Sequence, residues 1–274
     1  MKPIRHEYNG IVYFEYEPTI TAKSSDLPIL MIHGHGGDHR GLELLAGNMK
    51  SRVIIPDLPG FGESEELELH SIENYVLKLK KMMKHLKINK YSLVGHSLGS
   101  GVALALASAD TNVVKLILLN PVPEFTKYIQ YILHTINGIG GKIPQKYSDA
   151  LVSARLYNLA TFLMHSRQRR DLTHAKDYLN AQNTTKYSFR TWSESGEAIY
   201  TLDQVELAKN IMIPVLIVHG KTDSLTSSAT IKEFTSKFKN SELAVVANAG
   251  HFLPLEQAND VSIIIQTFLK GLNA

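Results

Sequence analysis

A serine lies at the centre of a glycine-flanked pentapeptide, Gly95-His96-Ser97-Leu98-Gly99. Residues 91–94 before it form a short apolar run, and residues 100–109 after it have the composition of a helix. In this strand, turn and helix context, a G-x-S-x-G sequence is typical of a nucleophile elbow. Such a turn holds the serine in a strained conformation, and the two glycines remove Cβ atoms that would collide there. The pattern therefore predicts that Ser97 is a nucleophile.

A serine hydroxyl is a weak nucleophile at neutral pH, so it needs a base that is in turn oriented by a carboxylate. His251 follows an apolar run at 242–247, and Asp223 follows another at 215–219. The three residues thus come after separate predicted strands, in the order Ser, Asp, His. We expect Ser97, His251 and Asp223 to act as nucleophile, general base and orienting acid.

A glycine-rich segment, His33-Gly34-His35-Gly36-Gly37, follows a further predicted strand at 29–33. In acyl transfer the oxyanion is bound by the N–H after the nucleophile and by a second N–H from the loop after the third strand. We expect the amides of Leu98 and His35 to be these donors. Gly36 is the alternative to His35, because a glycine lets a substrate approach the backbone closely.

The same segment contains a second set of possible ligands, His33, His35, Asp38 and His39. This set is similar to the H-x-H-x-D-H zinc sequence of metallo-β-lactamase-like hydrolases. One extra glycine shifts the last two residues out of that spacing. The sequence therefore favours the serine mechanism, and we expect no metal and no cofactor.

The composition restricts the possible compartments and partners. The chain of 274 residues has no cysteine, which excludes disulfides and thiolate nucleophiles and fits a reducing compartment. Lys and Arg number 29 against 26 Asp and Glu, so no strong field attracts nucleic acid. The N-terminal residues have no apolar segment, and no apolar run is long enough to span a bilayer. We expect a cytoplasmic protein with no nucleic-acid partner and no membrane span, either a monomer or a homodimer.

Short apolar runs alternate with helical patterns over most of the chain, which is typical of an α/β fold with a mostly parallel sheet. Two N-terminal runs joined by Asn9-Gly10 predict a hairpin. Apolar positions at helical spacing predict a helix that begins at residue 72 and a final helix over residues 261–272, with Asp260 as its N-cap. Eight strands are expected in all, at 4–8, 11–14, 29–33, 53–56, 91–95, 113–119, 215–219 and 242–247.

The alternation stops at 122–207, where helical and aromatic-rich segments follow one another. We expect this range to be an inserted helical cap on a core domain formed by 1–121 and 208–274. An insertion after the sixth strand would lie over the carboxyl ends of the strands, where open α/β sheets bind ligands. Side chains of its first helix are therefore candidates to line a substrate pocket, namely Phe125, Tyr128, Ile129 and Ile132.

On these motifs the chain resembles α/β-hydrolases of the esterase, lipase and enol-lactonase branch. The matching segments are residues 33–37, 57–64 (Asp-Leu-Pro-Gly-Phe-Gly-Glu-Ser), 95–99, 220–223 and 250–256. The resemblance implies an eight-stranded sheet with an antiparallel second strand, flanking helices, a helical cap, a Ser-His-Asp triad and no cofactor. It also implies that Asp57 forms a turn and is not catalytic. The expected activity is hydrolysis of a carboxylic ester or lactone of a small, largely apolar substrate through an acyl-enzyme on Ser97.

Two other functions fit the same motifs. A carbon–carbon bond hydrolase of this fold keeps the serine, and Arg190 in the predicted cap could bind a substrate carboxylate. Such enzymes resemble one another in a tryptophan shortly after the catalytic histidine, whereas Leu255 stands near that place here. A small-molecule sensor can also retain the triad, because the fold alone does not define a function. Dehalogenases and epoxide hydrolases are disfavoured, since they need a carboxylate nucleophile where this chain has Ser97.

Overall fold

A computed structural model of the chain describes residues 3–18, 27–124, 135, 138, 142–152 and 187–271. Within them lies an eight-stranded sheet in the order β1-β2-β4-β3-β5-β6-β7-β8. Strand β2 is antiparallel to both neighbours, and the remaining neighbours pair in parallel. The expected fold class, the eight strands and the antiparallel second strand are therefore confirmed. The strands are β1 (Ile4–Tyr8), β2 (Ile11–Tyr16), β3 (Ile29–Ile32), β4 (Val53–Pro56), β5 (Tyr91–His96), β6 (Val113–Leu119), β7 (Val215–Gly220) and β8 (Ser241–Val246).

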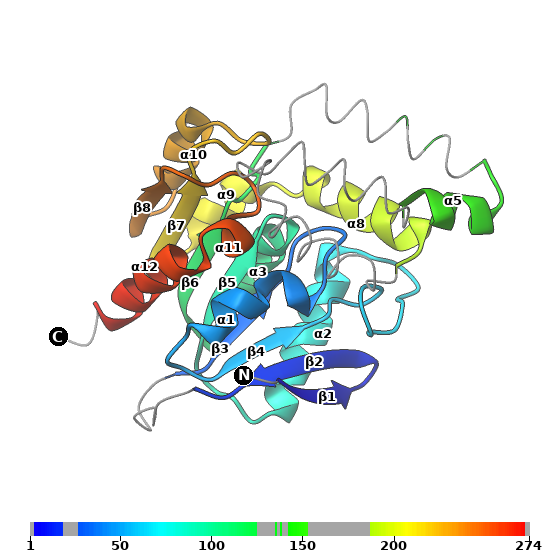
Figure 1. Cartoon of the computed structure of the whole chain (residues 1–274), viewed down its shortest axis with the longest axis horizontal. Coiled ribbons are helices and arrows are strands. Elements are labelled where there is room, and N and C mark those ends of the chain that lie inside the picture. The colour runs from blue at the N-terminus through cyan, green and yellow to red at the C-terminus, as the bar shows by residue number, and fades with distance from the viewer. Residues whose placement is uncertain are drawn as a thin grey trace.

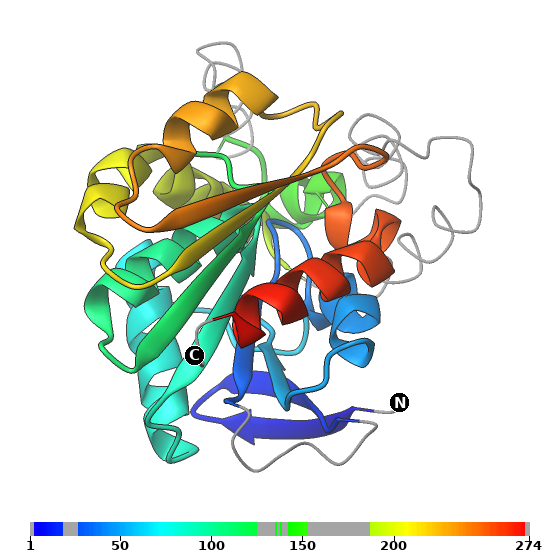
Figure 2. The same cartoon turned by 90° about the vertical axis from the view of Figure 1, so that its left-hand side faces the viewer.

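Helices cover both faces of the sheet, as Figures 1 and 2 show. One face carries α2 (Ile72–His85), α3 (Leu98–Ala109), α9 (Gln204–Asn210) and α10 (Ser228–Thr235). The other face carries α1 (Glu43–Gly47), α11 (Leu253–Glu256) and α12 (Ala258–Lys270), with a 3-10 turn, η1 (His39–Leu42), before α1. Two further helices, α5 (Gln145–Val152) and α8 (Phe189–Thr201), pack on each other, and α8 also contacts α2 and α3.

Two apolar layers form the core, one on each face of the sheet. Leu30 and Ile32 of β3 enter the layer beneath α2 and α3, whereas Ile29 and Met31 enter the layer beneath α1 and α12. Burial of both faces explains why the central strands read as continuous apolar runs without polar alternation. Ser71 caps the N terminus of α2 by accepting a hydrogen bond from Asn74 N–H.

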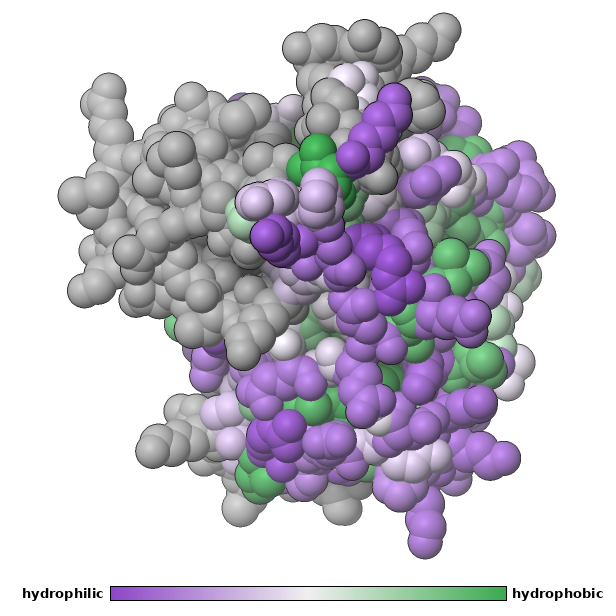
Figure 3. Space-filling model, turned by 90° about the vertical axis from the view of Figure 1, so that its right-hand side faces the viewer, coloured by the Kyte–Doolittle hydropathy of each residue, from purple (hydrophilic) through white to green (hydrophobic). Residues whose placement is uncertain are grey.

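The surface on the right of Figure 1 is mostly hydrophilic in its described part, and hydrophobic residues are scattered among polar ones there (Figure 3). None of the helices in the described ranges has the length and apolar character needed to cross a bilayer.

The expected cap, 122–207, is described at 122–124, 135, 138, 142–152 and 187–207. Its boundary at 207 falls inside α9, which packs on α3 of the core. The ends of the segment meet, because the Gln204 side-chain amide donates to the carbonyl oxygen of Val122 at 2.8 Å. The division into core and cap stays a prediction. The candidate pocket residues lie outside the described residues, and these are Phe125, Tyr128, Ile129 and Ile132.

Asp57 is fully buried at the end of β4 and organises the loop that follows. Its Oδ1 accepts hydrogen bonds from the backbone N–H and the Nδ1 of His39, both at 2.8 Å. Its Oδ2 accepts from Glu63 N–H at 2.9 Å, and its carbonyl oxygen accepts from the Ser64 hydroxyl at 2.6 Å. These bonds support a structural role for Asp57.

We predict that Asp57→Ala destabilises the fold. The change leaves the N–H groups of His39 and Glu63 without an acceptor, so the free energy of unfolding should fall by about 3 kcal/mol, from about 1–3 kcal/mol per buried unpaired group. Urea denaturation measures the effect, with Asp260→Ala on the exposed first turn of α12 as the control. Equal unfolding midpoints for the two variants would contradict the structural role.

Candidate active site

Ser97 joins β5 directly to α3 in a backbone conformation that is rare for a residue with a side chain. Its φ and ψ are 54° and −119°, and α3 begins at Leu98, two residues earlier than the sequence predicts. A Cβ on Gly95 would overlap the carbonyl group of Gly99, and a Cβ on Gly99 would overlap the carbonyl oxygens of Ile32 and His33. Both glycines are therefore required for the chain to turn this sharply.

The side chains of Ser97, His251 and Asp223 lie in one hydrogen-bonded chain. The Ser97 Oγ is 2.9 Å from His251 Nε2, and His251 Nδ1 is 3.0 Å from Asp223 Oδ2. A carboxylate only accepts hydrogen bonds, so the Nδ1 carries the proton and Nε2 can accept from the serine. The structure thus brings together three residues from the loops after β5, β7 and β8.

The Asp223 carboxylate is fully buried and remains a good acceptor. Burial alone would raise its pKa, but the His251 imidazole and the N–H of Leu225, which donates at 2.8 Å, together lower the pKa below its usual value. Asp223 is therefore ionised at neutral pH and would stabilise an imidazolium at His251.

Three residues that the sequence analysis did not identify fix the backbone around His251. Glu256, which is 4% exposed, accepts from Gly250 N–H at 3.0 Å and from Phe252 N–H at 3.1 Å. The Asn120 side-chain amide donates to the carbonyl oxygens of Gly250 and His251 at 2.8 and 3.0 Å. The signals in the sequence are weak: an acid in an otherwise apolar turn, and an asparagine at a strand end before a proline.

The third of these residues is His96, which precedes the nucleophile. Its Nε2–H donates to the carbonyl oxygen of His251 at 2.8 Å. Burial is the main cause that lowers the pKa of His96 to about 3, so the ring is neutral under ordinary conditions.

The glycine-rich loop at 34–37 lies beside the nucleophile. A Cβ built on Gly34 would be 3.3 Å from the Cβ of Ser97. His33 holds the start of the loop, because its Nε2 accepts from Leu58 N–H and its Nδ1 donates to Gly34 O, both at 2.9 Å. Leu98 begins α3, and the first amides of a helix have no intrahelical acceptor. The start of the loop and the start of α3 therefore both lie next to Ser97, and the assignment of the oxyanion donors stays a prediction.

Uncharged aromatic rings surround this loop. His35 lies 5.3 Å from Trp192 and 6.2 Å from Phe61, measured between ring centroids. The Phe61 ring also lies 5.5 Å from Tyr187, whose hydroxyl would be 3.4 Å from a Cβ on Gly36. Aromatic rings thus lie next to His35 and Gly36 of the loop.

Arg190 is bound to the segment that precedes α2. Its guanidinium group binds the Glu66 carboxylate at 2.7 Å and donates to the carbonyl oxygens of Glu68 and Leu67. Its side chain is 41% exposed, so the charge that the sequence offered for a substrate carboxylate is engaged at the surface.

The residues of the alternative zinc set do not come together in the described part of the chain. Asp38 and His39 instead cluster with Asp57, with ligand atoms within 4.8 Å of one another. The donors of this cluster are already engaged, because Asp57 binds His39 and Asp38 forms an ion pair with Arg40.

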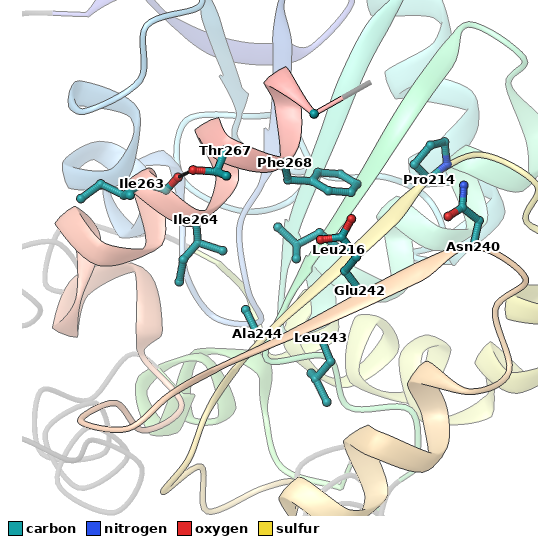
Figure 4. A pocket seen from close by; sticks show the side chains of 11 residues that line it. Pro214, Leu216, Asn240, Glu242, Leu243, Ala244, Ile263, Ile264, Thr267 and Phe268 are labelled. Atoms are coloured by element: carbon teal, nitrogen blue, oxygen red, sulfur yellow. Dashed lines mark hydrogen bonds between the residues drawn. The ribbon is translucent and has the colours of Figure 1, made fainter. Parts of the chain in front are cut away.

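Figure 4 shows a surface pocket of about 420 Å³ elsewhere in the molecule, between α12 and β8. Leu216 and Glu242, which line it, lie near the amino ends of β7 and β8. Asp223 and His251 follow the carboxyl ends of the same strands, so the pocket is separate from the site.

Comparison with known proteins agrees with the fold. The model of the alpha/beta hydrolase fold family matches residues 28–258. The chain belongs to this family. It is similar to the 2-hydroxymuconate semialdehyde hydrolase of Pseudomonas putida, with 26% identity over 276 residues that cover 94% of this chain and 92% of the relative.

Solved structures of other hydrolases share the fold. A thermophilic esterase from Thermogutta terrifontis superposes with a TM-score of 0.80 at 19% identity and covers 100% of both chains. The enol-lactonase from Burkholderia xenovorans LB400 also gives 0.80, at 17% identity, over 97% of this chain and 99% of its own. At these identities the two structures establish only the fold of this hydrolase-family chain.

We predict that Glu256→Ala slows the reaction of Ser97 with a sulfonyl fluoride. The variant removes the acceptor for the amides on both sides of His251, and a misplacement of about 1 Å in a reacting group costs on the order of 10²-fold in rate. Glu256→Gln keeps one acceptor oxygen, so its reaction rate should lie between those of wild type and Glu256→Ala. Mass spectrometry of the modified protein measures the rate, and an unchanged rate for Glu256→Ala would show that the loop is held without Glu256.

The low pKa of His96 predicts a loss of stability in acid. The unfolded chain binds a proton at His96 below about pH 6.5, whereas the folded protein does so only near pH 3. The contribution of neutral His96 to the free energy of unfolding is therefore complete above about pH 6.5. It falls by up to about 1.4 kcal/mol per pH unit as the pH decreases toward 3.

His96→Gln tests this assignment, because the glutamine amide can still donate a hydrogen bond but does not titrate. Denaturant unfolding between about pH 7.5 and 5 should show a slope against pH that is smaller in the variant by up to about 1.4 kcal/mol per unit. Parallel slopes would mean that His96 is protonated equally in the folded and unfolded states.

Proposed function

We propose that the protein hydrolyses a carboxylic ester or lactone of a small, largely apolar substrate through an acyl-enzyme on Ser97. The observation that carries the proposal is the hydrogen-bonded chain from Ser97 Oγ through His251 to the buried Asp223. A serine held by a strained turn and hydrogen-bonded to an imidazole is the arrangement that nucleophilic acyl transfer needs.

In the first step His251 Nε2 takes the hydroxyl proton as Ser97 Oγ forms a bond to the carbonyl carbon. The Asp223 carboxylate stabilises the resulting imidazolium and keeps its ring oriented. The tetrahedral intermediate collapses, and the imidazolium gives its proton to the leaving alkoxide. In the second step His251 deprotonates a water that attacks the acyl-enzyme, and Ser97 regains its proton as the acid leaves.

The negative charge of each intermediate would be bound by the amides of Leu98 and His35, with Gly36 as the alternative donor. Support comes from the loop at 34–37, which lies against Ser97, and from the N-terminal position of Leu98 in α3. One such donor contributes about 2.7–4 kcal/mol of transition-state stabilisation.

The surroundings of the site favour a neutral, apolar substrate. The described rings near the loop carry no formal charge, and the Arg190 guanidinium is bound to Glu66 at the surface. An ester or lactone therefore fits better than the anionic dienoate that a carbon–carbon bond hydrolase would take. Phe125, Tyr128, Ile129 and Ile132 remain the candidates to line the acyl pocket.

We predict that Ser97→Ala lowers kcat for p-nitrophenyl butyrate by about 10⁴ to 10⁶, since the triad residues act as a unit. Release of p-nitrophenolate measures the rate. Ser227→Ala, which changes the exposed N-cap of α10, is the matched control and should keep wild-type activity. Wild-type activity in Ser97→Ala would refute the proposal, and faster turnover of a coloured dienoate than of the ester would favour carbon–carbon bond hydrolysis.

A further inference from the structure

His35 occupies an unusual place, because its backbone belongs to the glycine-rich loop beside Ser97 while its side chain contacts α8. The loop has little internal support. Gly37 N–H donates to Gly34 O at a long 3.2 Å, and Gly36 adopts a φ of +70°. Three of the four residues at 34–37 are glycines, whose backbone is the most flexible of all residues. Contacts from outside the loop must therefore determine where the His35 amide lies.

The His35 side chain supplies such a contact. Its Nε2–H donates to the carbonyl oxygen of Trp192 at 2.8 Å. The ring is also close to the backbone of α8 at Gly196, where an added Cβ would be 3.6 Å from Nε2. Burial lowers the pKa of His35 to about 4, so the imidazole is neutral at pH 7 with its proton on the nitrogen that faces Trp192.

Helix α8 is itself fixed to the core, so it can serve as a support. Glu194 accepts from His70 N–H at 2.9 Å. The hydroxyl of Thr191, which is fully buried, donates to Glu66 at 3.2 Å and lies 3.0 Å from His70 Nε2. Together with Arg190, these residues bond the first half of α8 to the segment before α2.

We propose that the His35 side chain is a positioning residue that holds the loop amide in place for the oxyanion by its hydrogen bond to the Trp192 carbonyl of α8. This inference rests on the proposed function, because it assigns a purpose to a contact of the proposed oxyanion loop. In this role the imidazole acts through the backbone and is not assigned a contact with the substrate. Its effect is on the geometry of a backbone donor, and such donors act only if they are placed before the charge develops.

Side chains of different length at position 35 test whether the hydrogen bond to the Trp192 carbonyl oxygen matters for the rate. His35→Gln can bring an amide N–H close to the place of Nε2, whereas the shorter His35→Asn cannot. We expect kcat for p-nitrophenyl butyrate to stay within about threefold of wild type in His35→Gln and to fall at least tenfold in His35→Asn, since loss of one oxyanion donor costs on the order of 10²–10³. KM should change by less than about threefold, because the bond acts on the transition state.

A second readout separates positioning from general damage. A butylboronic acid forms a tetrahedral adduct with Ser97, so its Ki should rise by the factor by which kcat falls in each variant. Circular dichroism and the thermal midpoint establish that the variants fold. If His35→Asn does not fold, His35→Phe takes its place, because it keeps a ring but has no donor. His85→Gln and His85→Asn, on the exposed end of α2, are the matched controls and should change neither constant.

The outcomes are distinct. Equal kcat in wild type, His35→Gln and the variant that cannot reach the Trp192 carbonyl (His35→Asn, or His35→Phe in its place) would overturn the inference and leave the proposed function intact. A raised KM with unchanged kcat would also overturn it, because His35 would then only line the pocket. An inactive wild type whose Ser97 does not react with the boronic acid would overturn the proposed function and this inference with it.

Discussion

Hydrogen bonds to the peptide groups around His251 fix the backbone that carries its imidazole. Glu256 binds the amides before and after it, and Asn120 and His96 bind the carbonyl oxygens. A loop of this kind would otherwise be free to move, since it lies outside the sheet. The buried polar groups are satisfied by one another, so they do not carry the penalty of unpaired burial. The imidazole thereby meets Ser97 and Asp223 at hydrogen-bond distance.

Close packing of backbone groups determines the conformation of Ser97. Ser97 adopts a positive φ at a point where the first turn of α3 lies so close to the carbonyl groups of Ile32 and His33 that a Cβ on Gly99 would overlap them. Strain of this kind persists only when the surroundings determine it fully. Here the buried strands β3, β5 and β6 provide that support, and the hydroxyl of Ser100 donates to Gly95 O at 2.7 Å across the turn.

The sequence predicts the strands and the residues that directly follow them, but it does not predict hydrogen bonds between side chains and backbone groups far apart in the chain. The strands were predictable because apolar runs end at turn residues, and Ser97, Asp223 and His251 stand out because each follows such a run directly. Asn120 did not stand out, since the carbonyl groups that it binds are 130 and 131 residues away and its neighbours in the sequence indicate only a strand end. The hydrogen bond from the His35 side chain to Trp192 joins residues 157 positions apart, and nothing in the sequence indicates it either. Phe125 and its neighbours remain predictions, because they lie outside the described residues.

The bond between Gln204 and Val122 has a consequence for how such proteins diversify. It joins the two ends of the predicted cap, where the chain leaves β6 and returns toward β7. Because closing a longer loop between fixed ends costs little additional entropy, the flanking strands tolerate changes in the length of the intervening chain. Substrate selectivity can then change through that segment while the sheet and the residues at the ends of its strands stay the same.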